Sequence, residues 1–255
     1  MQRQFILTPF FLDEPLPGLG SLAKPHWKVN EPRLKGDDKQ SRMSVLHGQI
    51  ARFTEKTVLQ GDLPVSIAGD CCAAIGVLAG LQRAGVFPTL LWFDAHGDFN
   101  TWETSPSGFL GGMPLAMLVG RGEQTLLRNI GLRPIAEEQV ILTDARDLDP
   151  GECETIGQSH IQHLPDINRL FEINFSDRAL YIHFDTDIID PTAAPAMNYP
   201  VKGGPSPDAL SDIFHVLKNT AQICALSMSS WNPVVDGDHK SEAVCMELFS
   251  ILLPD

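Results

Sequence analysis

The sequence predicts an α/β fold, a three-layer α/β/α sandwich with a mainly parallel central sheet. From about residue 63, short apolar runs recur, each bounded by Gly, Pro or Asp and followed by a longer amphipathic stretch. The runs are apolar throughout, which indicates strands buried on both faces. Such strands separated by helices are typical of parallel βαβ units, in which helices cover both faces of one sheet.

The first 60 residues are polar and interrupted by Pro and Gly, which favours surface loops with a helix over residues 41–54. Residues 72–84 place Ala, Leu and Val at helical spacing and precede Gly85, a common helix C-cap. Strands are expected at the five apolar runs, which span residues 65–68, 89–93, 140–143, 179–184 and 223–228.

Length and charge limit the classes of protein that fit this sequence. The 255 residues suit a single domain, 1–255, whose motif-bearing part is 63–255. The chain has 19 Lys and Arg and 32 Asp and Glu, so its formal net charge is −13. This charge argues against nucleic acid or an anionic membrane as a partner. We expect a small-molecule substrate, and the acidic excess favours a cationic one.

The cysteines predict a reducing compartment, because their number is odd and two are adjacent, unlike a disulfide framework. The apolar run at residues 5–12 contains Pro9, precedes two acidic residues and lacks a cleavage pattern, so it is a poor signal peptide. No apolar stretch of the sequence reaches the roughly 18 residues that a membrane span needs. We therefore expect a cytoplasmic protein. The cysteines are Cys71, Cys72, Cys153, Cys224 and Cys245.

Acidic and histidine side chains follow two of the predicted strands. Asp94, His96 and Asp98 come after the second strand, and Asp185 and Asp187 come after the fourth. Alternate residues of an extended segment project to the same side, so each group converges. The carboxyl ends of parallel strands meet at one edge of the sheet, where ligands bind. We expect the two groups to face the same site.

Four carboxylates at one sheet edge repel one another, and divalent cations relieve that repulsion. One imidazole with several carboxylates suits a manganese-like ion, and two such ions can share a hydroxide that is ready to attack a substrate. One cluster alone is equally compatible with turn and capping residues. Two clusters at two strand ends favour a metal site.

The two clusters resemble the signatures of the arginase/agmatinase (ureohydrolase) family. The likeness extends over most of residues 63–255 and follows the family's order of motifs. It implies the three-layer α/β fold, two manganese ions, hydrolysis of guanidino C–N bonds and a homo-oligomer. The matching segments are 94-DAHGDFNTWETSPSG-108, 146-RDLDPGE-152, 183-HFDTDIIDP-191, 200-PVKGG-204 and 232-NP-233.

The resemblance also implies roles for the metal-site residues. Asp94 and Asp185 match ligands that bridge both ions, and His96 and Asp187 match ligands of the second ion. Asp98 matches a ligand of the first ion that passes the proton of the attacking hydroxide to the leaving amine.

A second set of residues matches the arginase contacts to an amino-acid head group. Asn100, Ser105 and Ser107 match the groups that hold the α-carboxylate, and Asp149 and Glu152 match those that hold the α-ammonium. This pattern favours an arginine-like substrate over agmatine. The alternative for residues 149–151 is a plain Asp-Pro-Gly turn.

The chain departs from the family at the first metal ligand, where Cys71 stands in place of a His. A thiolate is a softer ligand, which makes zinc, iron or cobalt alternatives to manganese. The other alternative is a small buried residue beside a weak or empty first site. A Cys at this position also resembles a small branch of the family that includes Nω-hydroxyarginine hydrolases.

Two further departures involve histidine. Gly111 stands where arginases have a proton-shuttling His near the mouth of the site. His183 replaces the usual Ser before the second carboxylate pair. It either compensates for the lost His or, the alternative that we favour, lies on the other face of its strand.

The family's Glu that pairs with the substrate guanidinium aligns with Ser230, a neutral residue. Either the reacting group of the substrate differs, or Asp236 or Asp238 replaces the Glu, or the site is not catalytic. Trp231 either closes the pocket or packs in the core. A bulkier, more apolar pocket wall is expected from Phe109, Met197 and Tyr199.

The sequence as a whole predicts a metal-dependent amidinohydrolase acting on a small arginine-like amino acid, of the arginine or Nω-hydroxyarginine class. One alternative is a degenerate homologue that binds an amino acid or a partner without turnover. Another is a metal-dependent hydrolase of a different C–N bond.

Overall fold

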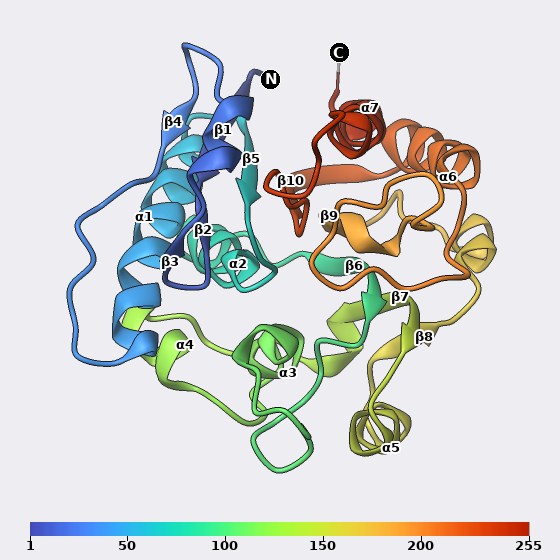
Figure 1. Ribbon diagram of the computed structural model, residues 1–255, viewed down its shortest axis with the longest axis horizontal. Helices are drawn as coiled ribbons and strands as arrows, with labels where there is room; N and C mark the ends of the chain where they lie inside the picture. Colours follow the sequence, from blue (N-terminus) through green and yellow to red (C-terminus); the bar gives the residue numbers. More distant parts are fainter. Residues whose placement is uncertain (255) are drawn as a thin grey trace.

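The computed structural model describes residues 1–254, which form an eight-stranded sheet with every strand pairing parallel, as predicted (Figure 1). The strand order is β4-β1-β5-β10-β9-β6-β7-β8. A separate antiparallel hairpin is made by β2 (Phe10–Phe11) and β3 (Glu14–Pro15). The strands of the large sheet are β1 (Arg3–Thr8), β4 (Lys28–Val29), β5 (Leu63–Ala68), β6 (Thr89–His96), β7 (Val140–Asp147), β8 (Gln162–Leu164), β9 (Ala179–Asp185) and β10 (Gln222–Ser229).

Helices cover both faces of this sheet. In Figure 1, α1 to α4 lie on one side, and α6 and α7 lie on the other. The α-helices are α1 (Lys39–Leu59), α2 (Ala73–Arg83), α3 (Pro114–Leu118), α4 (Thr125–Ile130), α5 (Pro150–Gln158), α6 (Pro207–Thr220) and α7 (Lys240–Leu252). The 3-10 helices are η1 (Pro17–Leu22), η2 (Leu110–Gly112), η3 (Glu137–Gln139), η4 (Ile167–Glu172) and η5 (Thr186–Ile188). None of the helices in residues 1–254 combines the length and apolar character that crossing a membrane requires.

The five predicted strands and two predicted helices are confirmed, with small changes at their ends. Three strands of the large sheet were missed. β4 and β8 have two and three residues, too few for a pattern to show. The apolar run at residues 5–12 contributes to β1, an inner strand that pairs with both β4 and β5.

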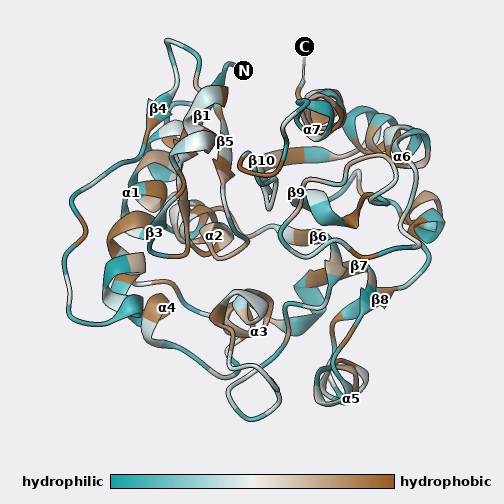
Figure 2. Ribbon diagram, in the orientation of Figure 1, coloured by the Kyte–Doolittle hydropathy of each residue, from teal (hydrophilic) through white to brown (hydrophobic). Residues whose placement is uncertain are grey.

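The apolar strands are continuous because the sheet has a core on each face. In β6, Leu90 and Trp92 pack in the core beneath α1 to α4, and Leu91 and Phe93 pack in the core beneath α6 and α7. Figure 2 shows apolar residues along the strands and on the inner sides of the helices. Burial of alternate side chains in opposite cores accounts for the lack of polar alternation.

The four inner strands β5, β10, β9 and β6 run in the same direction, so their carboxyl ends meet at one edge. The segments that leave this edge carry the residues singled out in the sequence. Cys71 follows β5, the motif 94–98 begins within β6 and passes its end, Asp187 follows β9 and Ser230 follows β10.

Close packing of α1 against α2 depends on glycine. A Cβ atom at Gly80 would lie 2.5 Å from both the Ala51 carbonyl oxygen and Thr54 Cβ. Gly48 of α1 has room, since its nearest neighbour would be Arg52 Nη1 at 3.8 Å.

We expect Gly80→Ala to lower the free energy of unfolding by about 1–3 kcal/mol, because the added methyl forces the two helices apart. Gly48→Ala is the matched control and should raise it by up to about 1 kcal/mol through helix propensity. Urea unfolding of the three proteins measures both effects. A Gly80→Ala variant as stable as the parent would show that the helices adjust without cost.

His47 in α1 makes stability depend on pH. The side chain is buried, its Nδ1 atom has no hydrogen-bond partner in the described part of the chain, and burial lowers its pKa from 6.5 to about 4. The folded protein therefore binds this proton less tightly than the unfolded chain. The contribution of the neutral His47 ring to the free energy of unfolding is fully present above pH 6.5 and is lost as the pH falls toward 4.

Between pH 7 and pH 5 the His47 contribution should lower the free energy of unfolding by about 2 kcal/mol. In His47→Gln, which cannot ionise, the loss over the same interval should be smaller by that amount. Urea midpoints at the two pH values test this, and equal losses in both proteins would contradict it.

Candidate active site

The residues singled out in the sequence line one cavity of about 400 Å³ at the carboxyl edge of the sheet. They come from parts of the chain that are far apart, namely the carboxyl ends of β6 and β9 and the segments that follow β5, β6, β7, β9 and β10. These residues are Cys71, Asp94, His96, Asp98, Asn100, Ser105, Ser107, Asp149, Glu152, Asp185, Asp187 and Ser230.

Three overlapping groups of side chains within this site have their potential ligand atoms within 4.8 Å of one another. Nearly all members are buried, and Asp94 and Cys71 each belong to two groups. The groups are Cys71, Asp94 and Asp98; Asp94, His96 and Asp187; and Cys71, His183 and Asp185.

The backbone brings these residues together differently from the expected extended segments. β6 ends at His96, and Asp98 has a left-handed φ of 51°. A turn therefore points Asp98 into the cavity. Asp187 lies in η5 and not in an extended segment, and its backbone N–H donates to Asp185 Oδ1 at 2.9 Å.

Like charges and burial together disfavour ionisation of the carboxylates. Burial, followed by the charges of Asp94 and Asp185, raises the pKa of Asp98 well above its usual value. Burial, followed by Asp187 and Asp94, raises the pKa of Asp185 in the same way. Burial opposes a charge on His96, but hydrogen bonds to Asp187 and Asp94 outweigh it and raise its pKa to about 12.

Asp98 Oδ2 is a buried oxygen with no hydrogen-bond partner among residues 1–254. Buried polar atoms are almost always paired, so this one needs a partner from outside the chain. A carboxylate oxygen beside other carboxylates and an imidazole is a donor set that fits a divalent cation.

Cys71 is buried among acceptors. Its Sγ atom donates to Asp185 Oδ2 and lies 3.2 Å from Ser229 Oγ and 3.9 Å from Asp94 Oδ2. Burial, followed by the charges of Asp185, Asp98 and Asp94, raises the pKa of the thiol well above its usual value. The thiolate is therefore disfavoured unless a cation compensates its charge.

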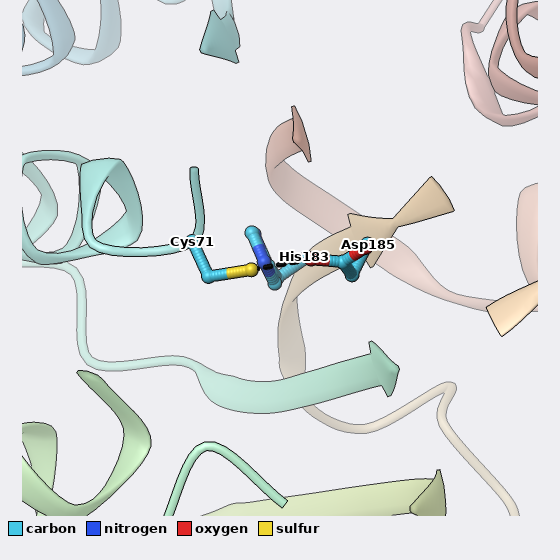
Figure 3. A group of neighbouring side chains, drawn as sticks. All are labelled: Cys71, His183 and Asp185. Atoms are coloured by element: carbon cyan, nitrogen blue, oxygen red, sulfur yellow. Dashed lines mark hydrogen bonds between the residues drawn. The ribbon is translucent and has the colours of Figure 1, made fainter. Parts of the chain in front are cut away.

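The expectation that His183 lies on the other face of its strand is wrong. Its ring points to the same side as Asp185 and faces Cys71 (Figure 3). β9 runs straight up to Asp185, so alternate residues share a face. Burial lowers the pKa of His183 to about 3, so the ring is neutral.

The proposed head-group residues form a polar layer that lines the same cavity. Asn100 Nδ2 donates to Asp149 Oδ2 at 3.0 Å, and Ser105 Oγ lies 3.4 Å from Ser107 Oγ. Glu152 accepts the backbone N–H groups of Phe99 at 2.7 Å and Asp149 at 3.3 Å. Burial raises the pKa of Glu152 to about 7, and its carboxyl group braces the turn that carries Asp98.

Ser230 lines the cavity with a left-handed φ of 75°, and its hydroxyl donates to Asp185 Oδ2. Neither aspartate considered as a replacement for the family's Glu reaches it. Asp236 is buried away from the cavity, where it accepts from Trp231 Nε1 at 2.8 Å and from the first residues of α7. Asp238 is exposed. Trp231 is a core residue, the second of its two predicted roles.

The expected apolar wall is only partly present. Phe109 and Tyr199 line the cavity with ring centroids 5.5 Å apart. Met197 does not line it, because it is buried beneath and accepts a hydrogen bond from Thr186. Gly111 lines the cavity, as expected for a residue near the mouth.

Several contributors were missed in the sequence. Trp92 Nε1 donates to Asp94 Oδ2 at 3.0 Å, which no motif indicated. Asp70 lines the cavity and accepts from Leu12 N at 2.7 Å, and its place two residues beyond the end of β5 was a usable signal. Phe11 and Asn198 also line it, from segments without a recognisable pattern.

Comparison with known proteins gives one family. The family model described as "Arginase family" matches residues 28–253. The chain is 32% identical to an arginase of Bacillus subtilis over 240 residues, 88% of this chain and 81% of that protein. It is 26% identical to the N(omega)-hydroxy-L-arginine amidinohydrolase of Streptomyces lavendulae over 251 residues, 97% and 85% of the two chains. The crystal structure of Bacillus subtilis arginase superposes with a TM-score of 0.84 and 26% identity, covering 100% of this chain and 99% of that chain.

Arg146 holds the loop that carries Tyr199 in place through hydrogen bonds to backbone carbonyl groups. Its guanidinium donates to the carbonyl oxygens of Val201 at 2.7 Å and of Asp187 and Lys202 at 3.3 Å. Arg146→Met keeps the stem but removes these bonds, and the loop should open more often. Hydrogen bonds from charged donors contribute about 1.5–3 kcal/mol, so trypsin should cleave after the exposed Lys202 at least about tenfold faster.

Cleavage after Lys202 is followed by mass spectrometry, and Arg178→Met at an exposed position is the control. An unchanged cleavage rate in Arg146→Met would mean that the loop is held by other contacts.

Proposed function

The chain belongs to the arginase family, and we propose that it is a metal-dependent amidinohydrolase that cleaves a guanidino-type C–N bond of a small arginine-like amino acid. The main observation behind this proposal is that one cavity holds both a carboxylate-rich group that could bind metal ions and a polar layer suited to an amino-acid head group. Relatives named for arginine and for N(omega)-hydroxy-L-arginine support this substrate class.

Two divalent ions are proposed for the buried groups. Asp94 and Asp185 would contact both, as the resemblance to the family implies, and Asp94 belongs to two of the three groups. Manganese is the expected ion, and Cys71 makes zinc, iron or cobalt alternatives. When bound, the ions would supply an activated water and a positive field for the developing charge. The remaining ligands are Cys71 and Asp98 for the first ion, and His96 and Asp187 for the second.

The protein's own groups would orient the substrate and move a proton. Asn100, Ser105 and Ser107 are proposed to hold the α-carboxylate, and Asp149 and Glu152 the α-ammonium. Because both Glu152 oxygens already accept backbone N–H groups, we propose that Asp149 carries most of the ammonium contact.

Asp98 is proposed to take the proton of the attacking water on its carboxylate and deliver it to the leaving nitrogen. A carboxylate that lines the cavity beside the metal ligands is a typical general base. Tyr199 and Phe109 would limit the access of bulk water.

Ser230 bears on the choice within this substrate class. Its hydroxyl donates a hydrogen bond to Asp185. Ser230 has no carboxylate, so it cannot make the bidentate contact to a guanidinium that a Glu makes. Binding of the reacting group would therefore rely on the carboxylates already at the metal-binding group. Cytoplasmic location and homo-oligomeric assembly stay predictions.

The proposal predicts product release by metal-loaded protein. After loading with manganese or cobalt we expect about two ions per chain by elemental analysis, and urea or hydroxyurea from arginine or Nω-hydroxyarginine. Asp98→Asn should lower kcat by about 10²–10⁴-fold, because the proton carrier is lost. Asp212→Asn, at an exposed position of α6, is the matched control.

Ions bound without product from either substrate would contradict the proposal and favour the degenerate homologue that binds without turnover. If the protein instead released an amine from a substrate without producing urea or hydroxyurea, a hydrolase of another C–N bond would be favoured.

A further inference from the structure

We infer that His183 is a direct metal ligand, which joins Cys71 and Asp185 in a mixed sulfur, nitrogen and oxygen site for a zinc-class cation. The inference deepens the proposed function, since it concerns the metal ligands of the same site. His183 stands where the family's usual residue is Ser, and Cys71 where it is His. The imidazole missing from one position is thus supplied from the other.

The first support is distance. The Cys71 sulfur, a ring nitrogen of His183 and a carboxylate oxygen of Asp185 lie within 4.8 Å of one another (Figure 3). Zinc bond lengths of about 2.0–2.3 Å place the ligand atoms of a tetrahedral ion roughly 3.5 Å apart. Cys71 Sγ and Asp185 Oδ2 are closer than that, at 2.5 Å, so these two side chains would have to move apart to admit an ion.

The second support is that the three donors already converge on one atom. Ser229 Oγ lies 3.2 Å from Cys71 Sγ, 3.3 Å from Asp185 Oδ2 and 3.4 Å from His183 Nε2. A cation beside this hydroxyl would meet all three donors, with Ser229 as a neutral neighbour. All four side chains are buried, with residue exposures of 5% or less.

The third support is the way in which the His183 ring is held. Its Nδ1 atom lies 2.7 Å from Ser227 Oγ, which in turn lies 2.7 Å from the Tyr181 hydroxyl. Trp92 packs against the ring with centroids 3.9 Å apart. Metal-bound histidines commonly donate their other ring N–H to a fixed acceptor, which sets the tautomer. A Nδ1–H donor to Ser227 leaves the Nε2 lone pair facing Cys71 and Asp185.

An independent observation indicates that this position takes a cation. Asp98 Oδ2 is buried without a partner, and a carboxylate oxygen of Asp98 lies within 4.8 Å of the Cys71 sulfur. The donor set around Cys71 is therefore a thiol, an imidazole and carboxylates. Sulfur and imidazole donors select zinc or cobalt over manganese.

Cadmium-113 NMR on the full chain tests direct coordination, because the ion couples to the protons of residues that it binds. The protein is stripped with a chelator and titrated with cadmium-113 ions. Among the cadmium signals, we expect one that is coupled both to the β-protons of Cys71 and to the ring protons of His183. His183→Ser, which installs the family's usual residue, should remove the ring coupling and weaken cadmium binding at least about tenfold.

His215→Ser, at an exposed position of α6, is the control and should change neither coupling nor affinity. Coupling to Cys71 without coupling to His183, or to neither residue, overturns the inference. Turnover is measured separately on the same protein. Product release without coupling to His183 would refute His183 as a metal ligand but leave the proposed function standing. Coupling to His183 without product release would support the ligand but contradict the proposed function.

Discussion

Mutual repulsion among buried carboxylates at the carboxyl edge of the sheet is the constraint around which the rest of the structure is organised. Asp94, Asp98, Asp185 and Asp187 come from two neighbouring strands and their following turns, so the topology itself forces them together. Burial and like charges raise the pKa of three of them. A cluster of this kind costs folding free energy unless cations or donors compensate it.

The surrounding groups mostly donate to this cluster or hold its turns. Trp92 and the hydroxyl of Ser230 donate to Asp94 and Asp185, respectively. Glu152 instead binds the backbone of the turn that carries Asp98, which fixes a left-handed residue in place. These contacts restrict where the carboxylates point, so the geometry of the site is defined before any ligand arrives.

Sequence patterns predicted the parts of the fold and site that have a strong local signal. Continuous apolar strands indicated the parallel sheet, and two acidic motifs at strand ends indicated the shared cavity. Short edge strands gave no pattern, and an inner strand was missed because Pro9 interrupts its apolar run. The face of His183 and the core position of Trp231 depend on strand straightness and on a buried partner, neither of which local sequence encodes.

The position of β10 in the sheet has a consequence for how the protein is made. β10 is the only described strand that pairs with both β5 and β9, yet it follows both in the chain. Until it emerges from the ribosome, the segment with Cys71 and the segment with Asp185 have no common neighbour in the sheet. The nascent chain therefore lacks the joined pair of Cys71 and Asp185 for most of its synthesis, whereas Asp94, His96 and Asp187 lie on or just after β6 and β9, which pair directly. Insertion of this one late strand both completes the sheet and brings Cys71 to Asp185, so a cation that needs this pair of donors can bind only when nearly the whole chain is available to fold.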